Sequence, residues 1–247
     1  MKSTLQLLSL VILLLLNACQ SPLSEQKVTS LSPIGVRIEM RQDLDDQKKN
    51  GVVVRLFDEK GYTIVNEGIK LKVNQLALEF NVRKELYYTT TTTYIANDIP
   101  VSPLYKFTIT LADGRTYNLG NLQPIAESSE KSILCAKRGD PNKDFVISWN
   151  DLKDVNELSI MKSVLLNTST KRERNYDYES IVTKKIGPAG QYIVPKSAYV
   201  DSISTIAGLE IKFIATKKGR LNPQLLGNST IVISGHHDKN VNFEDED

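Results

Sequence analysis

The run YKFTITLADGRTYNLG at residues 105–120 decides the fold class of this chain. Its apolar residues Phe107, Ile109 and Leu111 alternate with polar ones, and Asp113-Gly114 then leads into a second short run. An Asp-Gly pair between two such runs is typical of a β-hairpin, because a type I′ turn needs positive φ at both central residues. We therefore predict two antiparallel strands, each with one apolar face.

Runs with the same alternation lie on both sides of this hairpin. About seven of them, separated by turn signals, fall between residues 34 and 122, which matches an immunoglobulin-type sandwich. A second set begins near Phe145 and contains the single Trp149, which we expect in the core. We therefore predict an all-β fold of two immunoglobulin-like antiparallel β-sandwiches in tandem. Their limits are residues 34–126 for the first and 127–243 for the linker and second, with an acidic tail at 244–247.

The N-terminal segment has the layout of a secretory signal. Lys2 supplies a positive charge, residues 5–16 are apolar at all but two positions, and a small residue stands before Cys19. The apolar run is about a dozen residues long, whereas a spanning helix needs roughly 20, so we expect residues 1–18 to be cleaved. Residues 19–33 are rich in Ser and Pro and should form a flexible tether.

The tetrapeptide Leu16-Asn17-Ala18-Cys19 resembles the lipobox of bacterial lipoproteins. The resemblance implies that Cys19 is lipidated on sulfur, that the signal is cut just before it, and that the new amino terminus is acylated. Further along, VVVRLFDEKG, YKFTITLADGRTYNLG and GLEIKFIATKKGRLNP resemble the two-sandwich lipoproteins common in Bacteroidota. This implies attachment to the outer membrane through the lipid on Cys19, and leaves the periplasmic and surface faces both open.

Charge and motif content argue against several functions. The chain has 31 basic and 29 acidic residues, so it is no obvious binder of nucleic acid. It contains none of the spaced motifs of metalloproteases, serine hydrolases or phosphate-binding loops, and we expect neither an enzyme nor a cofactor. Cys135 lies among apolar neighbours, so we expect a buried thiol rather than a nucleophile or a disulfide partner.

One stretch resembles a calcium loop. Asp140, Asn142 and Asp144 have the spacing with which such a loop opens, and Asp151 stands at its twelfth position. Phe145, however, occupies the place where the loop needs Gly for a sharp turn. The stronger prediction is a simple turn between the sandwiches, since Asp, Asn and Pro favour turns without a metal.

The two histidines stand side by side near the end of the last predicted strand. Adjacent residues of a strand point to opposite faces, so His236 and His237 cannot both bind one ion without a bend. A metal site with Asp238 is therefore the weaker interpretation, and an exposed loop is favoured. We predict no metal centre in the chain.

Two stretches are candidates for surface contact or modification. Residues 87–94 are all tyrosines and threonines, which favour strands. Either Tyr87, Tyr88 and Tyr94 stack on a glycan, or the strand turns one face to the core and a Thr/Tyr face to solvent, which is favoured. Ser202, in Asp-Ser-Ile, resembles the acceptor for O-glycosylation of exported proteins in Bacteroidota.

These observations lead to three functional hypotheses. The first is a membrane-anchored, non-catalytic binding or accessory module of the cell envelope, with a glycan or an envelope protein as its ligand. The alternative is a structural subunit of a fimbria or envelope assembly, whose edge strands pair with a neighbour. The third is a hydrolase that uses carboxylates such as Asp43, Asp45 or Asp46, because paired carboxylates need no fixed spacing.

Overall fold

The computed structural model describes residues 28–44, 49–84, 90–166, 175–200 and 205–243. Within these residues the chain folds into strands β1 to β16 and two short 3₁₀ turns, η2 (Glu130–Ser132) and η3 (Lys196–Ala198), which confirms the all-β prediction. No helix in the described part has both the length and the apolar character needed to cross a membrane.

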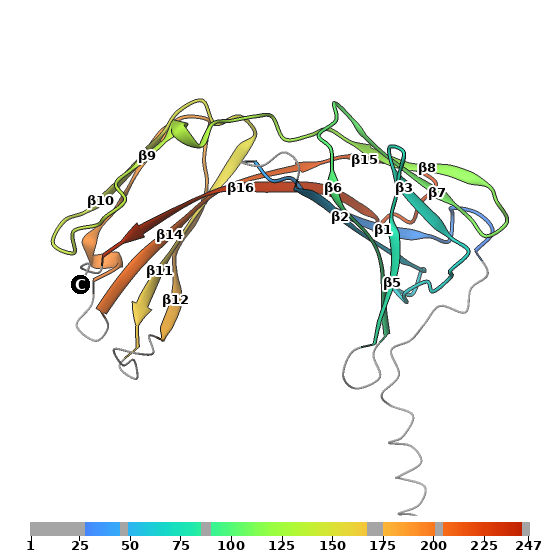
Figure 1. The fold of residues 1–247 in the computed structure, drawn as a ribbon, viewed down its shortest axis with the longest axis horizontal. Helices are drawn as coiled ribbons and strands as arrows, with labels where there is room; N and C mark the ends of the chain where they lie inside the picture. The colour runs from blue at the N-terminus through green and yellow to red at the C-terminus, as the bar shows by residue number, and fades with distance from the viewer. Residues whose placement is uncertain (1–27, 45–48, 85–89, 167–174, 201–204, 244–247) are drawn as a thin grey trace, which may run out of the picture.

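One eight-stranded sheet, sheet A, runs through the whole molecule. Its strands, in order, are β12 (Tyr176–Lys185), β11 (Val155–Leu165), β14 (Thr205–Lys218), β16 (Thr230–Asn242), β1 (Gly35–Arg41), β2 (Asn50–Phe57), β6 (Thr90–Ile99) and β5 (Glu79–Lys84). β16 is antiparallel to β14 and parallel to β1, so this one strand joins the two halves of the sheet. Figure 1 shows the result as an arch of two lobes whose inner side is lined by sheet A.

Two smaller sheets cover the other face of sheet A, one in each lobe. Sheet B, in the N-terminal lobe, has the order β15 (Arg220–Leu221), β8 (Thr116–Leu122), β7 (Tyr105–Thr110), β3 (Lys70–Val73) and β4 (Leu76–Ala77). Sheet C, in the C-terminal lobe, has the order β13 (Gly190–Val194), β10 (Phe145–Trp149) and β9 (Ile133–Cys135). Both lie on the outer side of the arch (Figure 1), so each lobe is a two-layer sandwich.

The core lies between these layers because alternate residues of each strand turn inward. In β7, Tyr105 and Phe107 are buried, whereas Lys106 between them is exposed. In the C-terminal lobe the ring of Trp149 meets Phe213 edge-on, with centroids 5.4 Å apart, and its indole N–H donates to the carbonyl of Gly187 at 3.0 Å. Trp149 is therefore a core residue, as predicted.

The hairpin of β7 and β8 is confirmed, but its turn differs from the prediction. Among its loop residues only Gly114 has a positive φ, +86°, and its N–H donates to the carbonyl of Leu111 at 2.9 Å. This pattern is typical of a three-residue loop, in which a type I turn is followed by one left-handed residue. The prediction of a type I′ turn was wrong, because Asp113 keeps a negative φ.

The N-terminal lobe is built from three parts of the chain. Besides the strands β1 to β8, it includes β15, which pairs with β8, and the first residues of β16, which pair with β1. At the N-terminal end of the described chain, Val28 and Leu31 fall within the predicted tether, yet both are buried in the core. The domain limits at residues 33/34 and 126/127 stay predictions. The burial of Val28 and Leu31 crosses the first limit, and the pairing of β15 and β16 with the N-terminal lobe crosses the second.

Side chains hold the segment between the lobes against the shared sheet. The amide of Gln42 donates to the carbonyl of Ile125 at 3.0 Å and accepts the N–H of Ile125 at 2.9 Å. The ammonium of Lys217 donates to Asp154 Oδ2 at 3.0 Å, and the same oxygen accepts the N–H of Ala126 at 2.7 Å. These contacts fasten residues 124–126 to strands of both lobes.

Candidate binding surface

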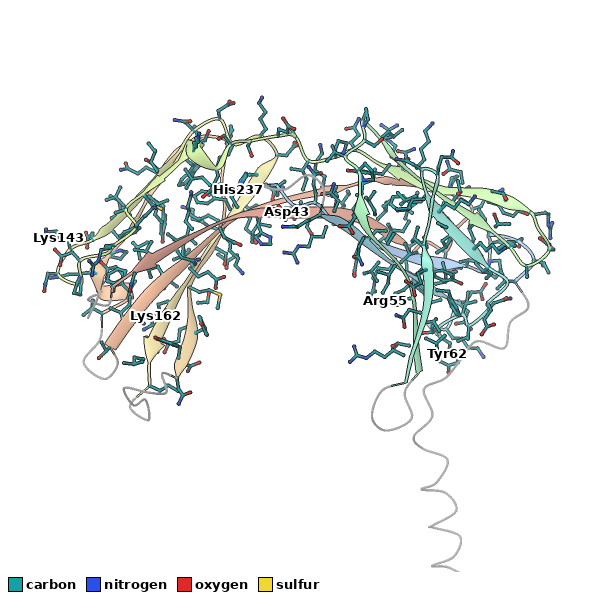
Figure 2. The ribbon with its side chains drawn as sticks, in the orientation of Figure 1. Asp43, Arg55, Tyr62, Lys143, Lys162 and His237 are labelled. Carbon is teal, nitrogen blue, oxygen red and sulfur yellow. The ribbon has the colours of Figure 1, made fainter. Side chains whose placement is uncertain are left out.

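The inner face of sheet A is not covered by another sheet in the part of the chain that the structure describes. Strand β16 illustrates the consequence, since its even-numbered residues lie on this face and its odd-numbered residues on the other. His236 is partly exposed and its Nε2 lies 3.2 Å from Asp238 Oδ2. His237 is fully buried, and its Nε2 lies 3.1 Å from Ser128 Oγ. The prediction that the two histidines point to opposite faces is therefore confirmed, and Figure 2 shows His237 where the lobes meet. The exposed loop favoured for them was wrong, because both lie within β16 and pair with β14.

A hollow of about 250 Å³ lies on this face in the C-terminal lobe. One of its lining residues, Tyr178, is 57% exposed. Tyr178 lies opposite Ser163, Ser163 opposite Gly208, and Gly208 opposite Asn242, so one row crosses four strands. Gly208 leaves the row open, because a Cβ there would stand only 2.8 Å from a backbone oxygen and 3.2 Å from Ser163 Oγ.

The hollow combines two tyrosines with the polar groups of serine and asparagine side chains, and Lys137 also lines it. Tyr176 lies two residues before Tyr178 on β12, and Asn240 precedes Asn242 by two on β16, so each pair shares the inner face. A tyrosine ring has an apolar face and a polar tip, and an amide offers both donors and an acceptor. This set can stack on the C–H face of a sugar and hydrogen-bond its hydroxyls.

Sequence reasoning missed these tyrosines. Strand β12 contains Tyr-Asp-Tyr-Glu-Ser, in which the two rings are two residues apart and therefore on one face. The signal was weak because β12 is an edge strand with few buried residues, and it lacks the apolar alternation that marks core strands. The signal that could have identified them is the spacing of Tyr176 and Tyr178, two residues apart beside acidic residues, which indicates two rings on one exposed strand face.

The prediction that Tyr94 contacts a ligand was wrong. Tyr94 is only 1% exposed and packs against the ring of Phe80, with centroids 5.0 Å apart. Burial raises the pKa of its phenol, and its hydroxyl donates to the carbonyl of Asn66 at 3.4 Å. The alternation of this strand turns Thr92 and Tyr94 into the core, whereas Thr91 faces the arch. Tyr87 and Tyr88 lie outside the described residues.

The calcium-loop residues form a turn that their own side chains stabilise, but it lies between β9 and β10 of sheet C and not between the sandwiches as predicted. Asp140 accepts the N–H of Asn142 at 2.9 Å and pairs with Lys143 at 3.0 Å, and these contacts lower the pKa of its carboxyl. Asp144 accepts the N–H of Lys196 at 2.9 Å. Within the described ranges, no three or more His, Cys, Asp or Glu residues come together as metal ligands.

The remaining predicted positions do not gather at one site. Cys135 lies on β9, partly buried against the core, and burial raises the pKa of its thiol. Asp43 is partly exposed, and its N–H donates to Asn50 Oδ1 at 3.1 Å. The lipidation, glycosylation and two further carboxylate candidates, Cys19, Ser202, Asp45 and Asp46, lie outside the described residues.

No family model and no curated protein matches this chain. Among solved structures, a cytokine receptor complex is similar with a TM-score of 0.30 and 8% identity, over 80% of this chain and 97% of that chain. The adhesin InvE of Yersinia pseudotuberculosis is similar with a TM-score of 0.25 and 9% identity, over 90% of this chain and 62% of that chain. Similarity at this level says nothing about ligands or partners.

Proposed function

We propose that this protein is a non-catalytic, lipid-anchored binding module of the cell envelope, and that it binds a glycan on the inner face of its arch. The observation that carries the proposal is the row of Tyr178, Ser163 and Asn242, which offers an exposed ring beside neutral polar groups. Tyr176 and Asn240, two residues away on the same strands, add a second tyrosine ring and a second amide to the hollow. The lipobox at Cys19 supports the anchor.

The ligand is tested by replacing the exposed ring. Glycan arrays and titrations with the full chain in detergent should identify a saccharide that it retains. Tyr178→Ala should then weaken binding by about tenfold, because exposed tyrosines are among the residues whose truncation costs most at binding surfaces. Leu76→Ala is the matched control, since Leu76 is also an exposed apolar residue but lies on sheet B. If no saccharide is retained and only an envelope protein is captured, the glycan part of the proposal fails.

The anchor is tested separately at Cys19. Two or more acyl chains hold a protein firmly on a membrane, whereas one chain does so only marginally. Cys19→Ser should therefore move the protein from the membrane fraction to the soluble fraction without changing its circular dichroism spectrum. A cleaved Cys19→Ser protein that still sediments with membranes would contradict the anchor.

A second candidate function rests on the edges of sheet A. Strand β12 ends the sheet on one side with ten residues, most of them exposed, and β5 ends it on the other. Open edges are templates for pairing with another chain, so the protein would serve as an assembly subunit. Light scattering on the detergent-purified chain decides this, because a strict monomer at high concentration would eliminate it.

A further inference from the structure

A second hollow on the inner face of the arch lies in the N-terminal lobe and contains two arginines. Arg37 on β1 and Arg55 on β2 are directly opposite each other in the antiparallel ladder, and both are exposed. Residues opposed in this way lie about 5 Å apart at their Cα atoms, and like charges there destabilise a sheet. Such a pair is stabilised when an anion binds between the two guanidinium groups. Figure 2 shows Arg55 in this lobe.

The acidic side chains of the protein compensate little of the positive charge of Arg37 and Arg55. Arg55 Nη1 lies 3.0 Å from Glu39 Oε2, but both side chains are about half exposed, so water weakens the pair. No ion pair joins Arg37 to an acid within the part of the chain that the structure describes. Each guanidinium has five N–H donors in a planar fork, and most of those on the two arginines remain for a ligand.

An aromatic ring forms the wall next to the arginines. Phe57 lies opposite Gly35 and lines the hollow. A Cβ on Gly35 would stand 2.0 Å from one carbon of the Phe57 ring and 2.5 Å from each of that carbon's neighbours. If the edge of the ring pointed at the glycine, the distances from this Cβ to the two neighbouring carbons would be much longer than the first. Because they are equal and only slightly longer, the ring covers Gly35 with its face. Gly35 thus lets the ring lie flat on β1, where Phe57 lines the hollow.

Polar groups from two turns complete the hollow, whose volume is about 290 Å³. Thr63 is held beside Phe57 by a bridge between their backbones, after a turn in which Gly61 adopts φ +82°. Asn228 comes from the turn just before β16. A hydroxyl and an amide therefore face the same space as the ring and the two guanidinium groups.

We propose that this hollow binds one acidic sugar unit of a glycan, with its carboxylate or sulfate group between Arg37 and Arg55. The inference rests on the proposed function and names its ligand class. Paired guanidinium groups match the geometry of an oxyanion, and the flat Phe57 ring matches the C–H face of a sugar ring. Thr63 and Asn228 supply partners for sugar hydroxyls.

The position of the hollow fits an extended chain of such units. Arg37 lies opposite Thr230 at the start of β16, whereas the tyrosine hollow includes Asn242 at its end. Twelve residues of strand separate these two positions, which corresponds to about 40 Å. Thr230 and Asn242 are both even-numbered and share the inner face, so one polysaccharide can contact both hollows.

The test uses the full chain in detergent and three oligosaccharide probes of equal length: oligogalacturonate with carboxylates, a carrageenan fragment with sulfates, and a neutral galactan fragment. We expect the acidic probe that matches the site to bind. Arg37→Gln and Arg55→Gln should each weaken its binding about tenfold, because charge-assisted hydrogen bonds are lost. Arg83→Gln is the matched control, since Arg83 lies on the same face of sheet A at the edge strand β5. It should change binding less than twofold.

Each outcome separates this inference from the proposed function. Loss of acidic-probe binding in both pocket variants but not in Arg83→Gln, with unchanged melting temperatures, supports the site, and the probe that binds identifies the acidic group. Retention of only the neutral probe, or equal binding by wild type and Arg37→Gln, overturns the acidic site while the glycan function stands. Retention of no saccharide overturns both.

Discussion

Asp154 connects the two lobes to the segment between them while remaining charged. Burial raises the pKa of its carboxyl, but the N–H of Ala126 and the ammonium of Lys217 lower it by more, so the pKa lies below its ordinary value. A carboxyl with a lowered pKa contributes stability that is fully present above its unfolded-state pKa. This contribution is lost as the pH falls through its folded-state pKa. The contact therefore stabilises the arch at neutral pH and fails in strong acid.

Asp154→Asn should lower the free energy of unfolding at pH 7 by about 1–2 kcal/mol, because a hydrogen-bonded charge pair is lost. Asn tolerates the positive φ of 58° at this position, so backbone strain should add little. Urea titrations should show the difference from wild type shrinking below about pH 4, where the carboxyl of the unfolded chain begins to be protonated, and vanishing below the lowered pKa of the folded state. A difference that stays constant from neutral to acid pH would contradict this assignment.

At the scale of elements, the connection between the lobes depends on Gln42, just beyond the end of β1. Its amide makes the two hydrogen bonds to Ile125 that a neighbouring strand would otherwise provide, and it is buried. Its own N–H continues the β1–β16 ladder by donating to the carbonyl of Ser234 at 2.8 Å. One residue thus extends a strand and fastens the segment that crosses between the lobes.

Gln42→Ala should destabilise the protein by about 2–4 kcal/mol, since it leaves a buried N–H and a buried carbonyl of Ile125 without partners. Hydrogen exchange should rise first at residues 124–128, before the strands of either lobe lose protection. Gln191→Ala, at an exposed position of β13, is the control and should leave exchange unchanged. Uniformly faster exchange throughout the molecule would argue against a local role.

Periodicity predicted most elements because alternation is a local property of a strand. It located β7 and β10 closely, where inward and outward residues alternate, and the start of β8, whose pattern breaks at the buried pair Leu119 and Gly120. It failed at β9, which is only three residues long, and at β12, which buries little. Leu76, Leu78, Phe80 and Val82 alternate with polar or small residues like a single strand, yet the chain there leaves sheet B after β4 and enters sheet A at β5. A change of sheet is set by distant partners, which alternation does not report.

For the whole molecule, pairing between distant segments matters more than local pattern. The parallel pairing of β1 with β16 has no signal in either strand alone, and it makes one sheet of two predicted sandwiches. The candidate site has the same limitation, because Tyr178, Ser163 and Asn242 are adjacent only through the order of strands in sheet A. Residue types could be read from the sequence, but their convergence could not.

The shared sheet predicts that the two lobes unfold together. Loss of either lobe would expose an edge of β16 and break the contacts that fasten residues 124–126. Scanning calorimetry should therefore show a single transition, with calorimetric and van't Hoff enthalpies that agree. Two resolved transitions would show instead that the sandwiches are independent domains, as the predicted limits imply.

The pairing of β1 with β16 also sets the order of events during folding. The N–H of Val36 donates to Ser229 Oγ, 193 residues further along the chain, and the strand ladder begins at the next residues. Contacts across such a separation form slowly, because a long loop must close before they contribute. Until residues 230–234 have been synthesised, one edge of β1 has no partner strand. An unfinished chain therefore cannot complete the folding of its N-terminal lobe. If the secretory signal predicted at residues 1–18 directs export, this delay should keep the chain from folding prematurely until most of its sequence has been made.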